Sequence, residues 1–291
     1  MPLFRGTRPL KRWRYVGIFC EELMVCAAIV QVGPARQAFW AVLSRKDRRL
    51  RERTHTLGGR GAVELGPGLR HVREGAGIDP GRTHVRDGGK AIPGRLRVRD
   101  GSVALYFELA EDAGIEALCP HGRGYVWTRK QAGIPARGTV ALDGGPPRVI
   151  EALAVVDDTA GYHARVTEWW WAAGVGVDPA GTPVAFNLVE GVNDPPAGSE
   201  RAMWVAGEPR EVAAVHFAPD LSRIDSAHGD IDDDAATHLR FTAEAQRSRR
   251  ESLLLVRSDY RAPFGTFSGT LPGGVELAQG VGVVEHHRAR W

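Results

Sequence analysis

Residues 155–191 read VVDDTAGYHARVTEWWWAAGVGVDPAGTPVAFNLVEG, and this stretch carries the clearest fold signal in the chain. Between Trp169 and Val177 the odd positions are apolar throughout, a period of two that is typical of a strand with one buried face. The tetrapeptide at 178–181, DPAG, has turn composition and predicts a hairpin. If Val177 pairs with Thr182, the same face also carries Val184, Phe186 and Leu188.

The other face of this predicted hairpin carries small residues. Gly174 and Gly176 lack side chains, so they either allow another backbone to pack closely or leave room for a ligand. Both interpretations remain open from the sequence, with close packing favoured.

The composition favours many short strands. The 291 residues include 36 glycines and 18 prolines spread along the chain, which interrupt long helices. The nearest candidate for a helix is 242–252, TAEAQRSRRES. The length allows one large or two small domains.

Charge and cysteine content exclude several classes of protein. The net charge is only +3, and the densest basic run, 45–53, is interrupted by acids, so a solvated edge strand is expected in place of a nucleic-acid surface. The three cysteines have no metal-ligand spacing, and their odd number argues against a disulfide scaffold. Residues 1–17 have basic side chains but no apolar core after them, so we do not expect them to act as a secretory signal, and the longest apolar run is too short to span a bilayer. We expect a cytoplasmic protein with no stable membrane insertion and no cofactor.

Two pairs of segments suggest an internal duplication. Residues 27–46 align without gaps to 172–191, and the series Gly-Thr, Gly-Gly, Val-Val-acid recurs in order within 138–158 and 269–286. Each copy ends with an apolar strand that runs into an acidic residue. We therefore predict an all-β fold of two tandem lipocalin-like antiparallel β-barrel or barrel-like sandwich units, 1–165 and 166–291. Closure of such units removes exposed strand edges.

The candidate catalytic residues lie at these acidic strand ends: Asp157, Asp158, His163, Glu285 and His286. A carboxyl group beside aromatic walls can acquire a raised pKa and donate a proton. The alternative is that these residues cap turns and pair with arginines. A metal site is not expected, because adjacent residues at 285–287 point to opposite faces and the aspartates of 230–234 lack calcium-loop spacing.

The candidate ligand-binding residues are aromatic or amide side chains. Asn187 occupies a position where the first alignment has Val42, so a buried amide there needs a protein or ligand partner. Adjacent tryptophans face opposite ways, and one of their faces could line a cavity. The predicted set is Tyr162, Trp169, Trp170, Trp171, Asn187 and Asn193.

Several motifs also carry a family resemblance. VVDDTAGYHARVTEWWWAAGVG, VAFNLVEGVNDPP, SERAMWVAGEP, SDYRAPFGTFSGTLPGG and GVGVVEHHRARW resemble the bacterial family catalogued as domain of unknown function 2804, over nearly the whole chain. Members of that family often have a longer N-terminal segment. More distantly, the middle of the chain is similar to two-unit lipocalin-like proteins such as hydroxyneurosporene synthase and tocopherol cyclase. Their acidic, histidine and tryptophan segment corresponds to Asp157-Asp158, His163 and 169–171, and the resemblance implies two barrel-like halves with an apolar pocket.

Three functional hypotheses follow. The first is binding of a hydrophobic small molecule, such as an isoprenoid or lipid, in a barrel pocket. The second is a cofactor-independent hydratase, cyclase or isomerase. In it Asp157 or Asp158 protonates an olefin or activates water, His163 or His286 assists, and tryptophan rings stabilise the developing cation. The third is a structural or protein-interaction module, which packed barrel interiors would favour. The sequence does not indicate an oligomeric state.

Overall fold

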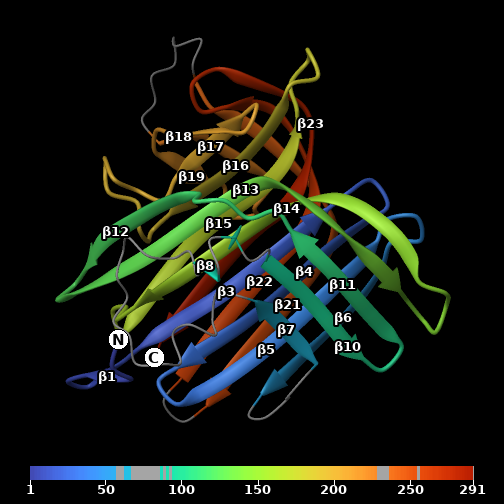
Figure 1. Cartoon of the computed structure of the whole chain (residues 1–291). Helices are drawn as coiled ribbons and strands as arrows, with labels where there is room; N and C mark the ends of the chain where they lie inside the picture. The colour runs from blue at the N-terminus through green and yellow to red at the C-terminus, as the bar shows by residue number, and fades with distance from the viewer. Residues whose placement is uncertain are drawn as a thin grey trace.

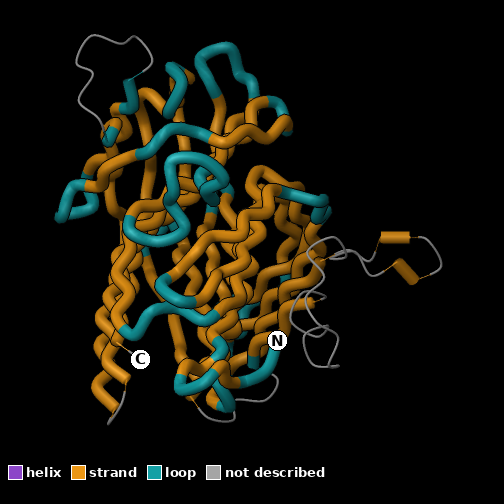
Figure 2. The backbone as a smooth tube through the Cα atoms, turned by 90° about the vertical axis from the view of Figure 1, so that its left-hand side faces the viewer, coloured by secondary structure: helices purple, strands orange, loops and turns teal. Residues whose placement is uncertain are grey.

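The computed structural model describes residues 1–56, 62–66, 86–87, 90–91, 94–227, 236–253 and 256–290. Every regular element among these residues is a strand, which confirms the predicted all-β class. Figures 1 and 2 show two large curled sheets. The described residues contain no helix able to cross a membrane. The aspartates of 230–234 lie outside the described residues.

The first sheet uses the N-terminal part of the chain. We call its strands the first unit, and they are β3 (Lys11–Phe19), β4 (Leu23–Val32), β5 (Ala35–Ser44), β6 (Arg49–Thr56), β7 (Val63–Gly66), β10 (Gly94–Asp100), β11 (Val103–Leu109), β12 (Ile115–His121), β13 (Gly124–Ala141) and β14 (Arg148–Gly161). Two small hairpins accompany them, β1 (Phe4–Arg5) with β2 (Arg8–Pro9), and β8 (Arg86–Asp87) with β9 (Lys90–Ala91). The basic run at 45–53 reaches into β6, which is an edge strand as expected.

The second sheet uses the rest of the chain. Its strands, here called the second unit, are β15 (Val166–Val177), β16 (Pro183–Glu190), β17 (Ala202–Val205), β18 (Glu208–Glu211), β19 (Val215–Phe217), β20 (Arg223–Ser226), β21 (His238–Leu253), β22 (Val256–Leu271) and β23 (Val275–Arg290). The helix candidate at 242–252 is wrong. That segment lies in β21, where pairing with β22 along its length outweighs local helix propensity.

Both units repeat one strand order. Without β12, the first sheet runs β6-β5-β4-β3-β14-β13-β11-β10-β7, and the second runs β18-β17-β16-β15-β23-β22-β21-β20-β19. Numbered along the chain within each unit, both orders are 4-3-2-1-9-8-7-6-5. This agreement confirms the duplicated architecture.

Only one of the two sequence alignments matches this topology. The hairpin β13–β14 is equivalent to β22–β23, as the second alignment predicts. The first alignment is wrong by one strand, because it matches β4–β5 to β15–β16, whereas the sheet order makes β3–β4 their equivalent. Neighbouring hairpins have the same alternation of small and branched residues, so sequence similarity alone could not separate them.

The predicted register of the β15–β16 hairpin is also wrong. Val177 pairs with Pro183, because the Asp178 carboxylate accepts hydrogen bonds from the backbone N–H groups of Ala180 and Thr182 and closes a longer loop. A slip of one residue exchanges the faces, so Phe186 lies beside Gly174 and away from Trp171.

Both faces of β15 are covered, which corrects the expectation of one buried face. The small residues are there for close packing: a Cβ on Gly174 would lie 2.7 Å from the Phe186 ring, and one on Gly176 would lie 2.2 Å from the Gln279 carbonyl oxygen. The glycines therefore leave no room for a ligand.

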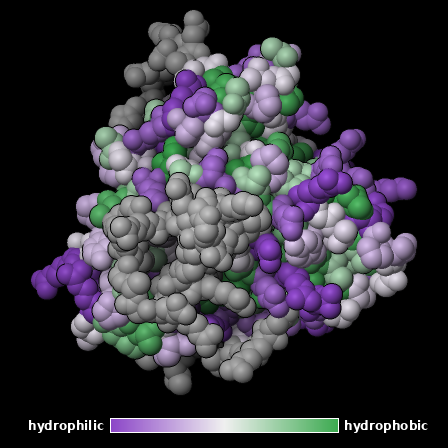
Figure 3. Space-filling model, in the orientation of Figure 1, coloured by the Kyte–Doolittle hydropathy of each residue, from purple (hydrophilic) through white to green (hydrophobic). Residues whose placement is uncertain are grey.

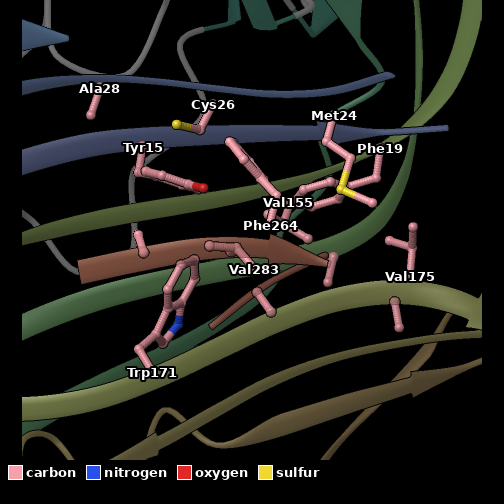
Figure 4. Packing of buried hydrophobic residues seen from close by; sticks show 14 of the residues in the cluster. Tyr15, Phe19, Met24, Cys26, Ala28, Val155, Trp171, Val175, Phe264 and Val283 are labelled. Atoms are coloured by element: carbon pink, nitrogen blue, oxygen red, sulfur yellow. The ribbon is translucent and has the colours of Figure 1, made fainter. Parts of the chain in front are cut away.

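Three apolar clusters explain this burial. One fills the curl of the first unit and includes Leu96, Val98 and Phe107, and another fills the second unit and includes Phe186, Phe217 and Phe267. The third cluster, which we call the interface core, joins the two units; Figure 4 shows Tyr15, Phe19, Met24, Cys26, Ala28, Val155, Trp171, Val175, Phe264 and Val283 from it. The two sheets are thus held together by an apolar core of their own.

Candidate functional site

Polar side chains enter the interface where β3 pairs with β14 and β15 pairs with β23. Asp157 is opposite Tyr15 in the first pair, and Glu285 is opposite Trp171 in the second. Trp13 lies two residues before Tyr15 on β3, and Trp169 lies two residues before Trp171 on β15, so the two tryptophans occupy equivalent positions. The duplication therefore brings two indoles and two carboxyl groups to one junction.

Each indole is hydrogen-bonded to the carboxyl group of its own unit. Trp13 Nε1–H donates to Asp157 Oδ2 at 2.9 Å, and Trp169 Nε1–H donates to Glu285 Oε1 at 2.9 Å. The two indole rings are nearly parallel, at 5°, with centroids 6.3 Å apart. Both indoles are partly exposed, whereas both carboxyl groups are buried. The indoles therefore lie at the solvent-facing end of the junction, which we call its mouth, and the acids lie behind them.

Glu285 is held in an environment that favours its neutral form. Burial raises its pKa to about 7, against hydrogen bonds from Trp169 and Tyr260, and the charge of Asp157 raises it further. His287, which lies 4.3 Å from the Trp169 ring, has its pKa lowered to about 3 by burial and by the charges of His286 and Arg247. At neutral pH the site therefore holds a carboxyl group able to donate a proton beside an uncharged imidazole.

Asp157 belongs to a buried ion network that crosses between the units. Lys130 Nζ lies 2.8 Å from Asp157 Oδ1 and 3.2 Å from Glu200 Oε1, and Thr159 Oγ1 donates to the same Asp157 oxygen at 2.8 Å. Burial lowers the pKa of Lys130, but the charges of Asp157 and Glu200 outweigh it and raise that pKa. Burial and the charge of Asp157 raise the pKa of Glu200, against the effect of Lys130.

The two candidate asparagines extend this network. Asn193 Nδ2 donates to Glu200 Oε2 at 2.9 Å, and Asn187 Nδ2 donates to the Glu200 carbonyl oxygen at 2.8 Å. Asn187 Oδ1 in turn accepts a hydrogen bond of 2.7 Å from Trp171 Nε1. The buried amide of Asn187 thus has protein partners, and its topological counterpart is Cys26 instead of Val42.

Asp158 and His286 lie on the opposite strand faces from Asp157 and Glu285. Asp158 is bound by Arg14 at 2.6 Å and Arg129 at 2.8 Å, and these cations hold its pKa below the ordinary value although burial acts the other way. His286 Nε2 lies 3.0 Å from a Glu168 carboxylate oxygen, and its ring stacks on Trp170 at 4.6 Å. The structure therefore does not bring these two candidates to the junction.

His163 and Tyr162 follow β14 directly. The Tyr162 hydroxyl donates to the Pro2 carbonyl oxygen at 2.7 Å and so holds the N-terminal segment. The His163 ring lies 5.2 Å from the Trp13 ring, and burial, then Lys11 and His121, lowers its pKa well below the usual value. His163 thus flanks the first indole at the edge of the junction.

The three consecutive tryptophans have separate positions. Trp169 lies at the junction mouth, Trp170 lies against His286 on the second-unit side, and Trp171 is buried in the interface core with its ring 5.3 Å from Tyr15 (Figure 4). A separate surface depression of about 500 Å³ is lined by residues 108–110, 135–137, 151 and 152 and includes none of the site residues. No cluster of three metal-ligand side chains occurs in the described ranges.

With the geometry established, the whole chain can be compared with known proteins. Residues 3–291 match the family model described as Domain of unknown function (DUF2804). The chain belongs to the DUF2804 family. This membership confirms the resemblance seen in the sequence motifs. No curated protein sequence matches this DUF2804 chain.

Two solved structures with similar folds are informative about the architecture. A Nitrosomonas europaea protein assigned as AttH has 11% identity and a TM-score of 0.53, covering 97% of this chain and 93% of its own. Kievitone hydratase from Nectria haematococca has 11% identity and a TM-score of 0.55, covering 95% of this chain and 88% of its own. At this identity the similarity concerns the fold.

Sequence reasoning on the DUF2804 chain missed Trp13, Lys130 and Glu200. Trp13 could have been found by aligning RWRYVGIF (12–19) with EWWWAAGV (168–175), which matches Trp13 to Trp169 and Tyr15 to Trp171. Lys130 and Glu200 gave no local signal, since the ion pairs of Lys130 with Asp157 and Glu200 join residues distant in sequence.

Proposed function

We propose that this protein binds a hydrophobic small molecule at the junction of the two units, against the indole faces of Trp13 and Trp169. The observation that carries the proposal is this pair of partly exposed, parallel rings backed by two buried carboxyl groups. Both unit interiors are occupied by apolar clusters, so we place the ligand at the junction and not inside a barrel. An isoprenoid or lipid-like molecule suits such a site because apolar walls supply affinity and a few polar groups supply orientation.

A ligand panel tests this proposal. Isoprenoid and fatty alcohols are added to the full chain, and melting temperature and tryptophan fluorescence are measured. A ligand present at 100 times its Kd is expected to raise the melting temperature by on the order of 5 °C. The double variant Trp13→Ala/Trp169→Ala should lose this shift.

Trp40→Phe is the matched control, because Trp40 is buried in the first unit and its Nε1 donates to Asp100. This variant should keep the ligand response. If no compound shifts the wild type, and solvent extraction of the purified protein recovers no lipid-like material, the binding proposal is wrong.

A second candidate is acid catalysis on the same ligand, favoured by the raised pKa of Glu285. Glu285 would transfer its proton to one carbon of an alkene, leaving a cation on the other carbon next to the indole faces. Addition of water and return of one proton to Glu285 completes a hydration, whereas loss of a ligand proton to the carboxylate completes an isomerisation or cyclisation. The hydratase among the solved structures of similar fold supports this candidate.

Substitution separates catalysis from binding. Glu285→Gln keeps an oxygen for the Trp169 N–H group but cannot supply the proton, so turnover should be lost while ligand affinity is kept. Asp157→Asn tests the equivalent acid. Unchanged turnover in either variant would remove that acid from the mechanism.

A structural or protein-interaction module is the third candidate, favoured by the filled unit interiors. It becomes the better explanation if the ligand panel gives no response. For any of these roles we propose a cytoplasmic location, because Cys20, Cys26 and Cys119 are all unpaired.

A further inference from the structure

A cluster of basic side chains surrounds His163, whose ring lies 5.2 Å from the Trp13 ring. Arg8 comes from β2, Lys11 from the start of β3, His121 from the end of β12, and His163 from the segment that follows β14. The rings of His121 and His163 lie 5.5 Å apart. Trp13 thus has the carboxylate of Asp157 at its Nε1 atom and a basic cluster near its ring.

His163 is the least satisfied member of this cluster. It is 3% exposed, and neither ring nitrogen has a hydrogen-bond partner in the described part of the chain. The backbone of Gly161 is close enough to favour the protonated ring but lies outside hydrogen-bond geometry. A buried imidazole with both nitrogens unpartnered is costly, so His163 offers hydrogen-bonding capacity to an added polar group.

Arg8 provides a second, independent unpartnered group. Its Nη1 atom is buried and has no hydrogen-bond partner among the described residues. The guanidinium lies over the turn after β12, where a Cβ on Gly122 would be 3.5 Å from Nη1 and 3.6 Å from Nη2. Among ion pairs of described residues, none joins Arg8, His121 or His163 to a carboxylate.

The basic groups of the cluster are close enough to lower one another's pKa values. Burial and the charge of Arg8 lower the pKa of Lys11 to about 7, and burial, then Lys11 and Arg8, lowers the pKa of His121. The carboxylate of Asp194 acts in the opposite direction and raises the pKa of His121. Lys11 Nζ donates to the Ala164 carbonyl oxygen at 3.3 Å, which holds the amine beside His163.

We propose that Arg8, Lys11, His121 and His163 bind the anionic head group of the ligand, a carboxylate or a phosphate, while its apolar part lies against Trp13 and Trp169. This inference rests on the proposed ligand site and adds the ligand's chemical class, an amphipathic anion. A guanidinium and unpartnered N–H donors suit either oxyanion, because charge-assisted hydrogen bonds to such oxygens are strong and directional.

Three probes with one alkyl chain test the inference: dodecanoate, dodecyl phosphate and dodecan-1-ol, each below its critical micelle concentration. Affinities for the full-length protein are measured by calorimetry. At least one anion should bind roughly tenfold or more tightly than the alcohol, since a hydrogen bond to a charged group contributes that much. The tighter of the two anions identifies the head group as carboxylate or phosphate.

Substitutions test whether the preference for an anionic probe depends on the basic cluster. His163→Phe and Arg8→Met should each bring anion affinity close to that of the alcohol, with alcohol affinity unchanged. Arg95→Met removes an equal charge from an exposed position on β10 and should leave the ratio as in the wild type. Arg8→Met keeps the test valid if His163→Phe fails to fold.

The outcomes separate the two proposals. If the alcohol binds as tightly as both anions, or if the anion preference survives in Arg8→Met, the head-group inference is overturned while the apolar site stands. If none of the three probes binds, both proposals are overturned.

Discussion

At the scale of residues, folding changes the pKa of Glu285. Its pKa is raised from an ordinary value of 4.5 to about 7, mainly by burial. Between these two values the folded protein binds a proton that the unfolded chain has released. Glu285 therefore stabilises the fold fully below pH 4.5, and this contribution is lost as pH rises through 7.

The first prediction isolates that contribution. Glu285→Gln mimics the protonated acid at every pH, so its stability relative to wild type should improve between pH 5 and pH 8 by up to about 3 kcal/mol, at 1.36 kcal/mol per pKa unit. Urea unfolding of both proteins across this range measures the difference, and subtracting the two curves cancels the titration of His163, His287 and Lys11. A flat difference would show that Glu285 is ionised in the folded state.

The second prediction concerns Lys130, which neutralises two buried carboxylates. Lys130→Met leaves Asp157 and Glu200 without their cation and should cost about 3–5 kcal/mol at pH 7. The triple variant with Asp157→Asn and Glu200→Gln should recover much of that loss.

An exposed ion pair offers the control. Arg137 and Glu151 lie 3.7 Å apart with both side chains more than 70% exposed, so Arg137→Met should change stability by less than about 0.5 kcal/mol. Equal losses in the two methionine variants would contradict a structural role for the buried network.

At the scale of elements, β23 lies between two paired strands and two apolar cores. It pairs with β15 on one side and β22 on the other, and it separates the interface core from the second-unit core. Gly282 lies where β15 approaches: a Cβ there would be 2.2 Å from the Ala173 carbonyl oxygen and 2.7 Å from the Gly174 Cα. Both close atoms are backbone, so a side-chain rotation cannot relieve the overlap.

The third prediction follows from that contact. Gly282→Ala should destabilise the protein by about 2–3 kcal/mol, as overpacking does in well-packed cores. Gly66→Ala is the comparison, because a Cβ there meets nothing within 4 Å and its φ is not in the left-handed region. Denaturant midpoints at constant m-value give the change in free energy of unfolding for each of the two variants. A Gly282 variant as stable as the Gly66 variant would mean that β15 and β23 can separate freely.

At the scale of the whole molecule, side-chain contacts cross between the units. Arg45 of the first unit pairs with Glu244 at 2.7 Å, and Arg247 of the second unit pairs with Glu52 at 3.1 Å and covers the Phe39 ring at 4.0 Å. The interface core adds apolar contacts from both sheets. On the face seen in Figure 3, by contrast, hydrophilic and hydrophobic side chains are mixed over the coloured residues.

The fourth prediction is that the units unfold together. Phe264, in the interface core, is 1% exposed, and Phe264→Ala should cost about 3–5 kcal/mol. Unfolding followed by far-UV and near-UV circular dichroism should give one coincident transition at a lower midpoint. Phe4→Ala, at a 51% exposed position, is the control and should leave the midpoint nearly unchanged. Two separated transitions would show that the shared core does not couple the units.

The sequence by itself determined the all-β class, the repeated unit and the equivalence of the acidic strand ends. These features follow from local patterns that can be read without the tertiary structure. The patterns are the alternation of apolar residues, the spacing of glycine and proline, and the ordered match of 138–158 with 269–286. Asp157 and Glu285 were therefore found from their places on matching strands.

Only the tertiary structure decided which face of each strand meets the other unit. A one-residue change of register in the β15–β16 hairpin exchanged the faces, and the loop geometry of Asp178 that set it is not part of the alternation pattern. The separation of Asp157 from Asp158, the recruitment of Lys130 and Glu200, and the pairing of Trp13 with Trp169 all depend on how two curled sheets pack. That packing brings together residues distant in sequence, and burial at the junction then sets their charge states.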